Sequence, residues 1–268
     1  MQFKLTLTST QRETFVPFDY PYALSAVIYR KLADADQQYA SFLHGKGYAQ
    51  NEHSRHFKFF TFSNLQGKFK VVKEALQLQG QQLNLVLACH MPEFAGNLVQ
   101  GIFADQQFTL AGRGAKGAFI ISQIETLPLL FPAEEDNRHI VKLQLLSPLV
   151  VGRLNERGHD DYLSPEDTAF VPLLKHNLME KIAVAYGQEA TSAEITDFHI
   201  GPLNRMKTRL NTIKAGQAAE TKVRGYFGFE LEMEASGRVI QLALDAGLGT
   251  MNGVGFGCVG EGKQIQVS

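Results

Sequence analysis

The chain has 268 residues, of which 44% are hydrophobic, and its formal net charge is −1. These values predict one large or two ordinary globular domains and give no whole-protein attraction to nucleic acid. No apolar stretch reaches the eighteen or so residues that a membrane span requires, and the strand-like start of the chain lacks the apolar core of a signal peptide. Cys89 and Cys258 stand outside any CxxC motif, which predicts buried free thiols in a cytoplasmic protein.

Hydrophobic spacing in the first half predicts the order strand, helix, strands, helix, strand. The expected strands are Phe3–Thr8, Phe57–Phe62, Gln82–Cys89, Phe108–Leu110 and Ala118–Glu125; the expected helices are Tyr22–Lys31, a second one capped by Asp34 or Asp36 and ended by Gly45 and Gly47, and one from Pro92 to Phe103.

After a proline-containing acidic linker at Leu127–Arg138, the second half repeats this plan. Its expected elements are a strand at His139–Leu146, a long helix starting near Ser164 or Glu166–Asp167, strands at Ser192–Ile200 and Val223–Glu232, a helix capped by Ser236 and running through Ala246, and a final strand at Phe256–Val259. Two βαββαβ halves predict an α+β protein with tandem ferredoxin-like domains, at residues 1–127 and 138–268.

Basic residues gather in two stretches that contain no acid. Residues 53–73 hold five lysines and arginines, and Phe198–Ala219 holds Arg205, Lys207, Arg209 and Lys214. If the second stretch is a strand, its first three basic residues share one face, which Lys214, Lys222 and Arg224 would extend. The pattern favours local anion binding, although charge runs also occur as solvated surfaces.

Five glycines, at 247, 249, 253, 255 and 257, lie within Leu244–Val259. Such a stretch can expose several backbone N–H groups to a phosphate, or it can form a tight turn between a helix and a buried strand. No Gly-Lys-Ser/Thr follows it, so it is not a P-loop. No βαβ unit follows it either, which excludes a dinucleotide-binding loop.

Four segments resemble the CRISPR-associated endoribonuclease family that cuts precursor CRISPR RNA within its repeats, a part of the repeat-associated RNA-binding proteins. These segments read YPYALSAVIYRKLADADQQYASFLHGKGY at Tyr20–Tyr48, HFKFFTFSNL at His56–Leu65, LQLLSPLVVGR at Leu143–Arg153 and GLGTMNGVGFGCV at Gly247–Val259. The resemblance spans both halves and implies the same tandem ferredoxin-like fold.

The resemblance also implies a reaction without metal or other cofactor, in which the ribose 2′-OH attacks the adjacent phosphorus. A tyrosine and a histidine take part in that family, and Tyr29 and His44 occupy the matching positions. His44 is expected near a helix C-terminus, which favours its imidazolium and the role of general acid. A lysine follows in the family, but residues 49–52 here read Ala-Gln-Asn-Glu. Lys46 is the first candidate for its role; His53, Arg55 and Lys58 are the other substitutes.

CRISPR repeat RNA is the partner that the resemblance implies. The expected RNA contacts are Arg55, Lys58, Arg205, Lys207, Arg209, Lys214 and Lys222, with the glycines Gly247, Gly249, Gly255 and Gly257. Two alternatives stay open: a non-cleaving RNA-binding subunit of a CRISPR effector complex, and a small-molecule or nucleotide-binding ferredoxin-like protein unrelated to RNA. Contacts with other effector subunits and a homodimer are open as well.

Overall fold

The structure of the chain is a computed structural model that describes residues 1–156, 160–194, 196–214, 218 and 220–262. Parts of three predicted features lie outside the described residues. They are Ile195 in the predicted strand Ser192–Ile200, residues 215–217 and 219 of the second basic stretch, and residues 263–268 of the predicted second domain.

The first half forms a five-stranded antiparallel sheet in the order β3-β6-β1-β8-β7, and β2, β5 and β4 form a small second sheet. Helices α1 and α3 connect the sheet strands as a ferredoxin-like βαββαβ unit does. The elements are β1 (Gln2–Ser9), β2 (Phe15–Pro17), α1 (Tyr20–Ala35), α2 (Gln37–Gly45), β3 (Phe60–Phe62), β4 (Phe69–Val72), β5 (Ala75–Leu78), β6 (Gln82–Cys89), α3 (Pro92–Ala104), β7 (Gln107–Gly112) and β8 (Ala115–Leu127).

The second half repeats the arrangement with a four-stranded sheet in the order β12-β15-β9-β16, and two hairpins, β10-β11 and β13-β14, are added to it. Its elements are β9 (Arg138–Leu145), β10 (Gly152–Leu154), β11 (Asp160–Tyr162), α4 (Phe170–Tyr186), α5 (Gln188–Ala193), β12 (Asp197–Ile200), β13 (Lys207–Ile213), β14 (Thr221–Phe227), β15 (Leu231–Ser236), α6 (Gly237–Ala246), the 3₁₀ helix η1 (Asn252–Val254) and β16 (Val259–Glu261). Both halves are therefore ferredoxin-like, and the predicted fold class is confirmed.

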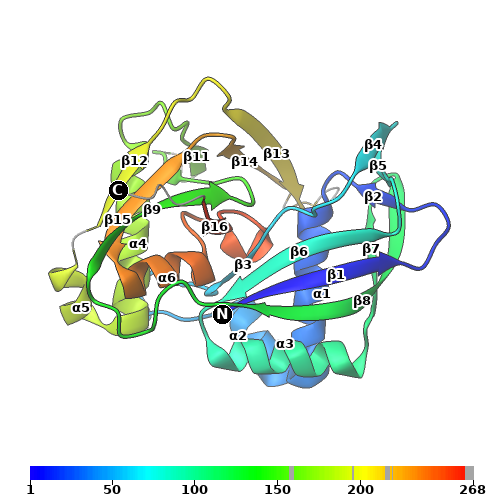
Figure 1. Cartoon of the computed structure of the whole chain (residues 1–268), viewed down its shortest axis with the longest axis horizontal. Helices are drawn as coiled ribbons and strands as arrows, with labels where there is room; N and C mark the ends of the chain where they lie inside the picture. The colour runs from blue at the N-terminus through cyan, green and yellow to red at the C-terminus, as the bar shows by residue number, and fades with distance from the viewer. Residues whose placement is uncertain (157–159, 195, 215–217, 219, 263–268) are drawn as a thin grey trace.

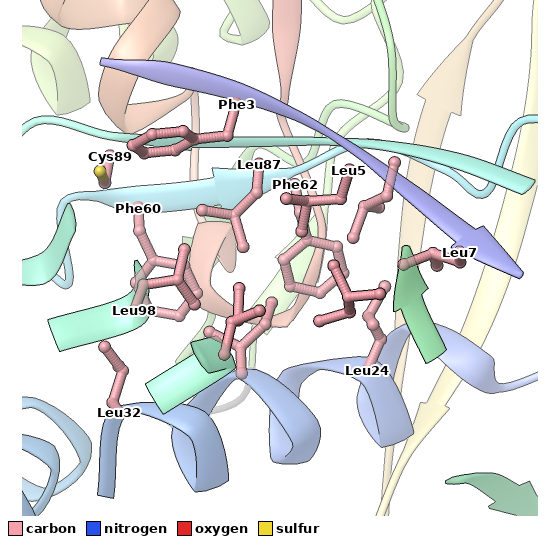
Figure 2. Packing of buried hydrophobic residues seen from close by; sticks show 14 of the residues in the cluster. Phe3, Leu5, Leu7, Leu24, Leu32, Phe60, Phe62, Leu87, Cys89 and Leu98 are labelled. Carbon is pink, nitrogen blue, oxygen red and sulfur yellow. The ribbon is translucent and has the colours of Figure 1, made fainter. Parts of the chain in front are cut away.

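The core of the first half follows from the alternation of β1. Phe3, Leu5 and Leu7 are buried and belong to one core cluster with Leu24 and Leu32 of α1, which lie on the helix side of that cluster (Figure 2). Burying each such side chain contributes roughly 1.5–3 kcal/mol.

The two halves pack together rather than standing apart. Helix α6 is buried on nearly all sides because it contacts β3 and β6 of the first half as well as β15 and β16 of the second; Figure 1 shows it in orange between the two sheets. Across the same boundary, the guanidinium of Arg209 donates to Asn64 Oδ1 at 2.8 Å and to the Tyr20 hydroxyl at 3.1 Å. The predicted division at residues 127 and 138 stays a proposal.

The aromatic strand expected at Phe57–Phe62 is shorter than predicted. Phe59 has a positive φ of 51°, so the chain turns there and β3 begins only at Phe60. Phe57 and Phe59 consequently enter the core of the second half, whereas Phe60 and Phe62 enter that of the first.

Three predicted boundaries in the second half are wrong for local reasons. The expected strand Val223–Glu232 is two strands, because Gly228 turns the chain with a φ of 79°. Ser192 belongs to α5, so the strand there starts at Asp197. The last strand starts at Val259 rather than Phe256.

The helix expected from Ser164 starts at Phe170. The Ser164 carbonyl accepts from Asp167 N at 2.9 Å, and the Asp167 carbonyl accepts from Phe170 N at 3.0 Å, so these residues form turns before α4. Ser236 does precede α6, but its hydroxyl bonds Glu194 instead of capping the helix.

No helix in the described part of the chain is long and apolar enough to cross a membrane. The cytoplasmic location stays a prediction.

Candidate active site

A cavity of about 720 Å³ lies where the two halves meet. Its walls come from α1, the end of α2, the segment before β3, the hairpins β10-β11 and β13-β14, helix α4 and the glycine-rich loop. The lining residues are Tyr22, Ser25, Ala26, Tyr29, His44, Arg55, His56, Phe57, Lys58, Gly152, Asp160, Asn177, Ile213, Lys214, Thr221, Gly249, Thr250, Met251, Asn252, Gly253 and Val254.

Tyr29 and His44 meet on one wall of this cavity. Tyr29 comes from α1 and His44 from the last turn of α2, and their ring centroids are 5.1 Å apart in an edge-on arrangement. Asp36 caps α2 by accepting hydrogen bonds from Gln38 N and Tyr39 N, which places His44 at the negative end of this helix. The His44 side chain is exposed, so its imidazole can reach a bound molecule.

The hydroxyl of Tyr29 stays protonated at neutral pH. The ring is mostly buried, and burial raises the pKa of Tyr29 because the phenolate would be poorly solvated there. Tyr29 can therefore orient a substrate oxygen through a hydrogen bond, but it is unsuited to remove a proton.

The segment His56–Lys58 runs beside the end of α2, with Phe57 in an isolated antiparallel bridge to Tyr48. The Nδ1 atom of His56 lies 3.0 Å from the carbonyl oxygen of Lys46. Lys58 Nζ donates to the carbonyls of Leu43 and of His44, the latter at 3.0 Å. Partial burial lowers the pKa of Lys58. These contacts fix the helix end that carries His44.

Part of the glycine-rich loop of Gly247–Gly257 lines the cavity, and Lys181 of α4 contacts this loop. The fully buried ammonium donates to the carbonyls of Gly247 at 2.6 Å and Gly249 at 3.1 Å, and to Asn252 Oδ1 at 2.8 Å. Burial lowers the pKa of Lys181 to about 7.

Several glycines in the loop have no room for a side chain. Gly249, with a φ of +63°, would place a Cβ atom 2.2 Å from the Val150 carbonyl oxygen, and Gly257, with a φ of +68°, would place one 1.9 Å from that of Leu248. Ser25 ties the loop to α1 by donating to the Gly253 carbonyl at 2.6 Å. The loop is therefore a packed turn that also borders the cavity.

The structure brings together some of the predicted site residues and leaves others outside. Those that line the cavity are Tyr29, His44, Arg55, Lys58, Lys214 and Gly249. Those that do not are Lys46, Arg205, Lys207, Arg209, Lys222, Gly247, Gly255 and Gly257. Lys46 instead has an exposed side chain beyond α2, and its carbonyl contacts His56. The roles predicted for all these residues stay predictions.

The second basic stretch does not form the single strand face that its spacing predicted. Arg205 precedes β13, and the register of the hairpin puts Lys222 opposite Thr212 and Arg209 opposite Gly225. Lys222 and Arg224 therefore lie on the opposite face of the hairpin from Lys207 and Arg209.

Two cavity residues, His56 and Asn177, were not named as site residues from the sequence, nor was Lys181, which contacts the glycine-rich loop without lining the cavity. His56 directly precedes the expected strand Phe57–Phe62, while Asn177 and Lys181 lie four residues apart among the buried, mostly apolar positions of α4. Both side chains are almost fully buried, and the amide of Asn177 has no hydrogen-bond partner among the described residues. Polar residues at core positions of α4 could have indicated Asn177 and Lys181, because a buried polar group requires a hydrogen-bond partner.

No cluster of three or more His, Cys, Asp or Glu side chains that could hold a metal ion occurs within the residues that the structure describes.

The chain matches two family models that adjoin along the sequence. The model described as "CRISPR-associated protein Cas6, N-terminal" matches residues 15–125, and the model described as "CRISPR associated protein Cas6, C-terminal" matches residues 131–260. A curated relative, "CRISPR-associated endoribonuclease Cas6 1" of Methanocaldococcus jannaschii, is 25% identical over 263 residues, which are 97% of this chain and 92% of that protein.

Solved structures share the fold over nearly the whole chain. One is described as "Characterization of a Cas6-related gene from Pyrococcus furiosus"; it has a TM-score of 0.77 and 20% identity and covers 99% of each chain. Another, "An RAMP protein binding different RNA substrates", has a TM-score of 0.79 and 18% identity and covers 98% of this chain and 100% of that one. Because the two Cas6 models together account for both ferredoxin-like halves, the chain belongs to the CRISPR-associated Cas6 family.

Proposed function

We propose that the chain is an endoribonuclease that cleaves CRISPR repeat RNA in the precursor transcript and so releases mature guide RNAs. The ribose 2′-OH attacks the adjacent phosphorus, and the products carry a 2′,3′-cyclic phosphate and a free 5′-OH. The reaction needs no metal ion, because side chains supply the acid, the base and the positive charge.

One observation carries this proposal: Tyr29, His44 and several cationic side chains border the same cavity. His44 is exposed at the C-terminal end of α2 and borders the cavity, so it can reach the departing 5′-oxygen and protonate it. Tyr29 orients the reacting ribose through its hydroxyl. Arg55, Lys58 and Lys214 stabilise the charge that develops on the phosphorane.

The named activity of the Methanocaldococcus relative supports the same assignment. Family membership leaves the roles of single residues open, and these are tested by mutation.

The test is incubation of the purified chain with repeat RNA in excess chelator, followed by mass spectrometry of the product ends. We expect cleavage at one phosphodiester, a cyclic phosphate on the 3′ end, and no cleavage when the nucleotide before that bond is 2′-deoxy. RNA binding without cleavage would instead identify a non-cleaving subunit.

The matched variants are His44→Ala and His199→Ala, because His199 is also exposed but lies on β12 outside the cavity. We expect His44→Ala to lower the single-turnover rate about 10²- to 10⁴-fold with little change in RNA affinity, the usual contribution of a general acid. His199→Ala should cleave like the wild type. Full activity of His44→Ala would remove His44 from the mechanism.

A further inference from the structure

The proposed reaction requires a group that removes the 2′-OH proton, and Tyr29 is unsuited to that role. Its burial favours the neutral phenol, so the tyrosine keeps its own proton. A base must therefore come from another group that borders the same cavity. Besides His44, the other charged or titratable groups on its lining are Tyr22, Arg55, His56, Lys58, Asp160 and Lys214.

His56 is oriented for proton abstraction by a contact with the main chain. Its Nδ1 atom lies 3.0 Å from the Lys46 carbonyl oxygen, which can only accept a hydrogen bond. The proton of the neutral imidazole therefore resides on Nδ1, and the lone pair of Nε2 remains available. The side chain is exposed and borders the cavity, so a ribose hydroxyl can approach that nitrogen.

His56 also lies close to the helix end that carries His44. Residues 56 and 58 share one side of an extended segment, since the intervening Phe57 is buried and bridges to Tyr48. The side chain of His56 contacts the carbonyl of residue 46, and that of Lys58 contacts the carbonyl of residue 44. One contact holds the His56 side chain at the C-terminal end of α2, and the other holds the backbone of His44 at the same helix end.

We propose that His56 is the general base of the reaction and that His44 is its general acid, an inference that rests on the proposed function. Nε2 of His56 takes the proton from the 2′-OH while that oxygen forms a bond to phosphorus. The bond from phosphorus to the 5′-oxygen breaks, and this oxygen receives a proton from His44. Both histidines return to their starting forms by exchanging a proton with water.

The first test asks whether His56 acts as a base or only through its hydrogen bond to the Lys46 carbonyl. In His56→Asn, the side-chain amide can still donate to the Lys46 carbonyl, but no titratable nitrogen remains. We expect the single-turnover cleavage rate of His56→Asn to fall about 10²- to 10⁴-fold, with RNA affinity unchanged within about twofold. The rate of the wild type should rise and then fall between about pH 5 and pH 9, and the variant should lose the rising limb. Wild-type rate in His56→Asn would show that the contact alone matters and would overturn the proposal.

The second test assigns the two roles. A repeat RNA with sulfur in place of the 5′-bridging oxygen has a leaving group that needs no acid. We expect this substrate to restore cleavage by His44→Ala and not by His56→Asn. Rescue of His56→Asn alone would reverse the roles and overturn the proposal. A wild type that cleaves no repeat RNA would instead defeat the proposed function itself, so the two failures are distinguishable.

Discussion

Lys181 shows how a single buried lysine can shape the cavity without bordering it. Its ammonium lies beneath the glycine-rich loop, where its hydrogen bonds go to the Gly247 and Gly249 carbonyls and to Asn252. Asn252 in turn holds two other parts of the loop, since its amide nitrogen donates to the carbonyls of Leu248 and Phe256. Lys181, from a distant part of the chain, therefore restrains the loop together with Ser25.

We predict that Lys181→Met destabilises the protein by about 2–4 kcal/mol, because it leaves buried acceptors without a donor. Lys175→Met is the matched control on the same helix: Lys175 forms a partly exposed ion pair with Asp197, and such a pair contributes at most about 1 kcal/mol. Urea unfolding of both variants measures the difference. Equal stabilities of the two variants would show that the loop does not rely on Lys181.

At the scale of elements, only some positions of the glycine-rich loop require glycine, because only there does the backbone leave no room for a Cβ atom. Gly257 approaches the Leu248 carbonyl with a positive φ, whereas a Cβ atom on Gly253 would meet nothing closer than 3.4 Å, at the Phe60 ring. The spacing of the glycines alone does not reveal this distinction, because both positions read the same in the sequence.

We predict that Gly257→Ala lowers stability by about 2–4 kcal/mol or more, since the added methyl group clashes with backbone and the φ is unfavourable. Gly253→Ala should change stability by less than about 1 kcal/mol. Thermal unfolding of the two variants is the measurement, and a destabilisation confined to Gly253→Ala would contradict the loop geometry.

Helices and strands with a regular hydrophobic spacing over many residues were predictable from the sequence. Short strands and strands broken by a turn were not. The alternation of β1 and the helical spacing of α1 and α3 predicted these elements within a few residues. The small sheet of β2, β4 and β5 escaped because its strands have at most four residues. The turn at Phe59 escaped because a positive φ at a phenylalanine is set by tertiary packing and not by local preference.

The candidate-site residues that a family resemblance indicated could be named from the sequence. The prediction missed residues that only the fold brings to the cavity. Tyr29 and His44 were named from the sequence, and the structure places them on one wall. His56 was missed because its cavity position depends on how an extended segment lies along α2. No sequence periodicity encodes such a contact between a helix C-cap residue and an irregular segment.

At the scale of the whole molecule, His90 links the two halves. Its ring lies against Phe59, with 5.8 Å between centroids, and edge-on to Tyr186 of α4, with 5.6 Å. Burial, and secondarily the charge of the Met1 amino group, lowers the pKa of His90 to about 4. The imidazole is consequently neutral in the folded protein, whereas an unfolded chain takes up a proton near pH 6.5.

We predict that acid weakens the folded state through His90. Between about pH 6.5 and pH 4 the unfolded state binds more protons than the folded state at this residue, so stability falls as the pH falls. When the pH falls across that range, the free energy of unfolding of His90→Leu should decrease by about 1–3 kcal/mol less than that of the wild type. Urea unfolding at both pH values measures this difference, and parallel losses in the two proteins would exclude His90 as a source of the acid sensitivity.

The cavity has walls from α1 and α2 and also from residues 249–254, which lie more than two hundred positions later in the sequence. A ribosome must therefore have translated nearly the whole of the described chain before this pocket can exist. Nascent chains that hold only the first half carry Tyr29 and His44 but lack residues 249–254 of the cavity lining. The cavity that we propose as the cleavage site is therefore complete only once residues 249–254 have been synthesised.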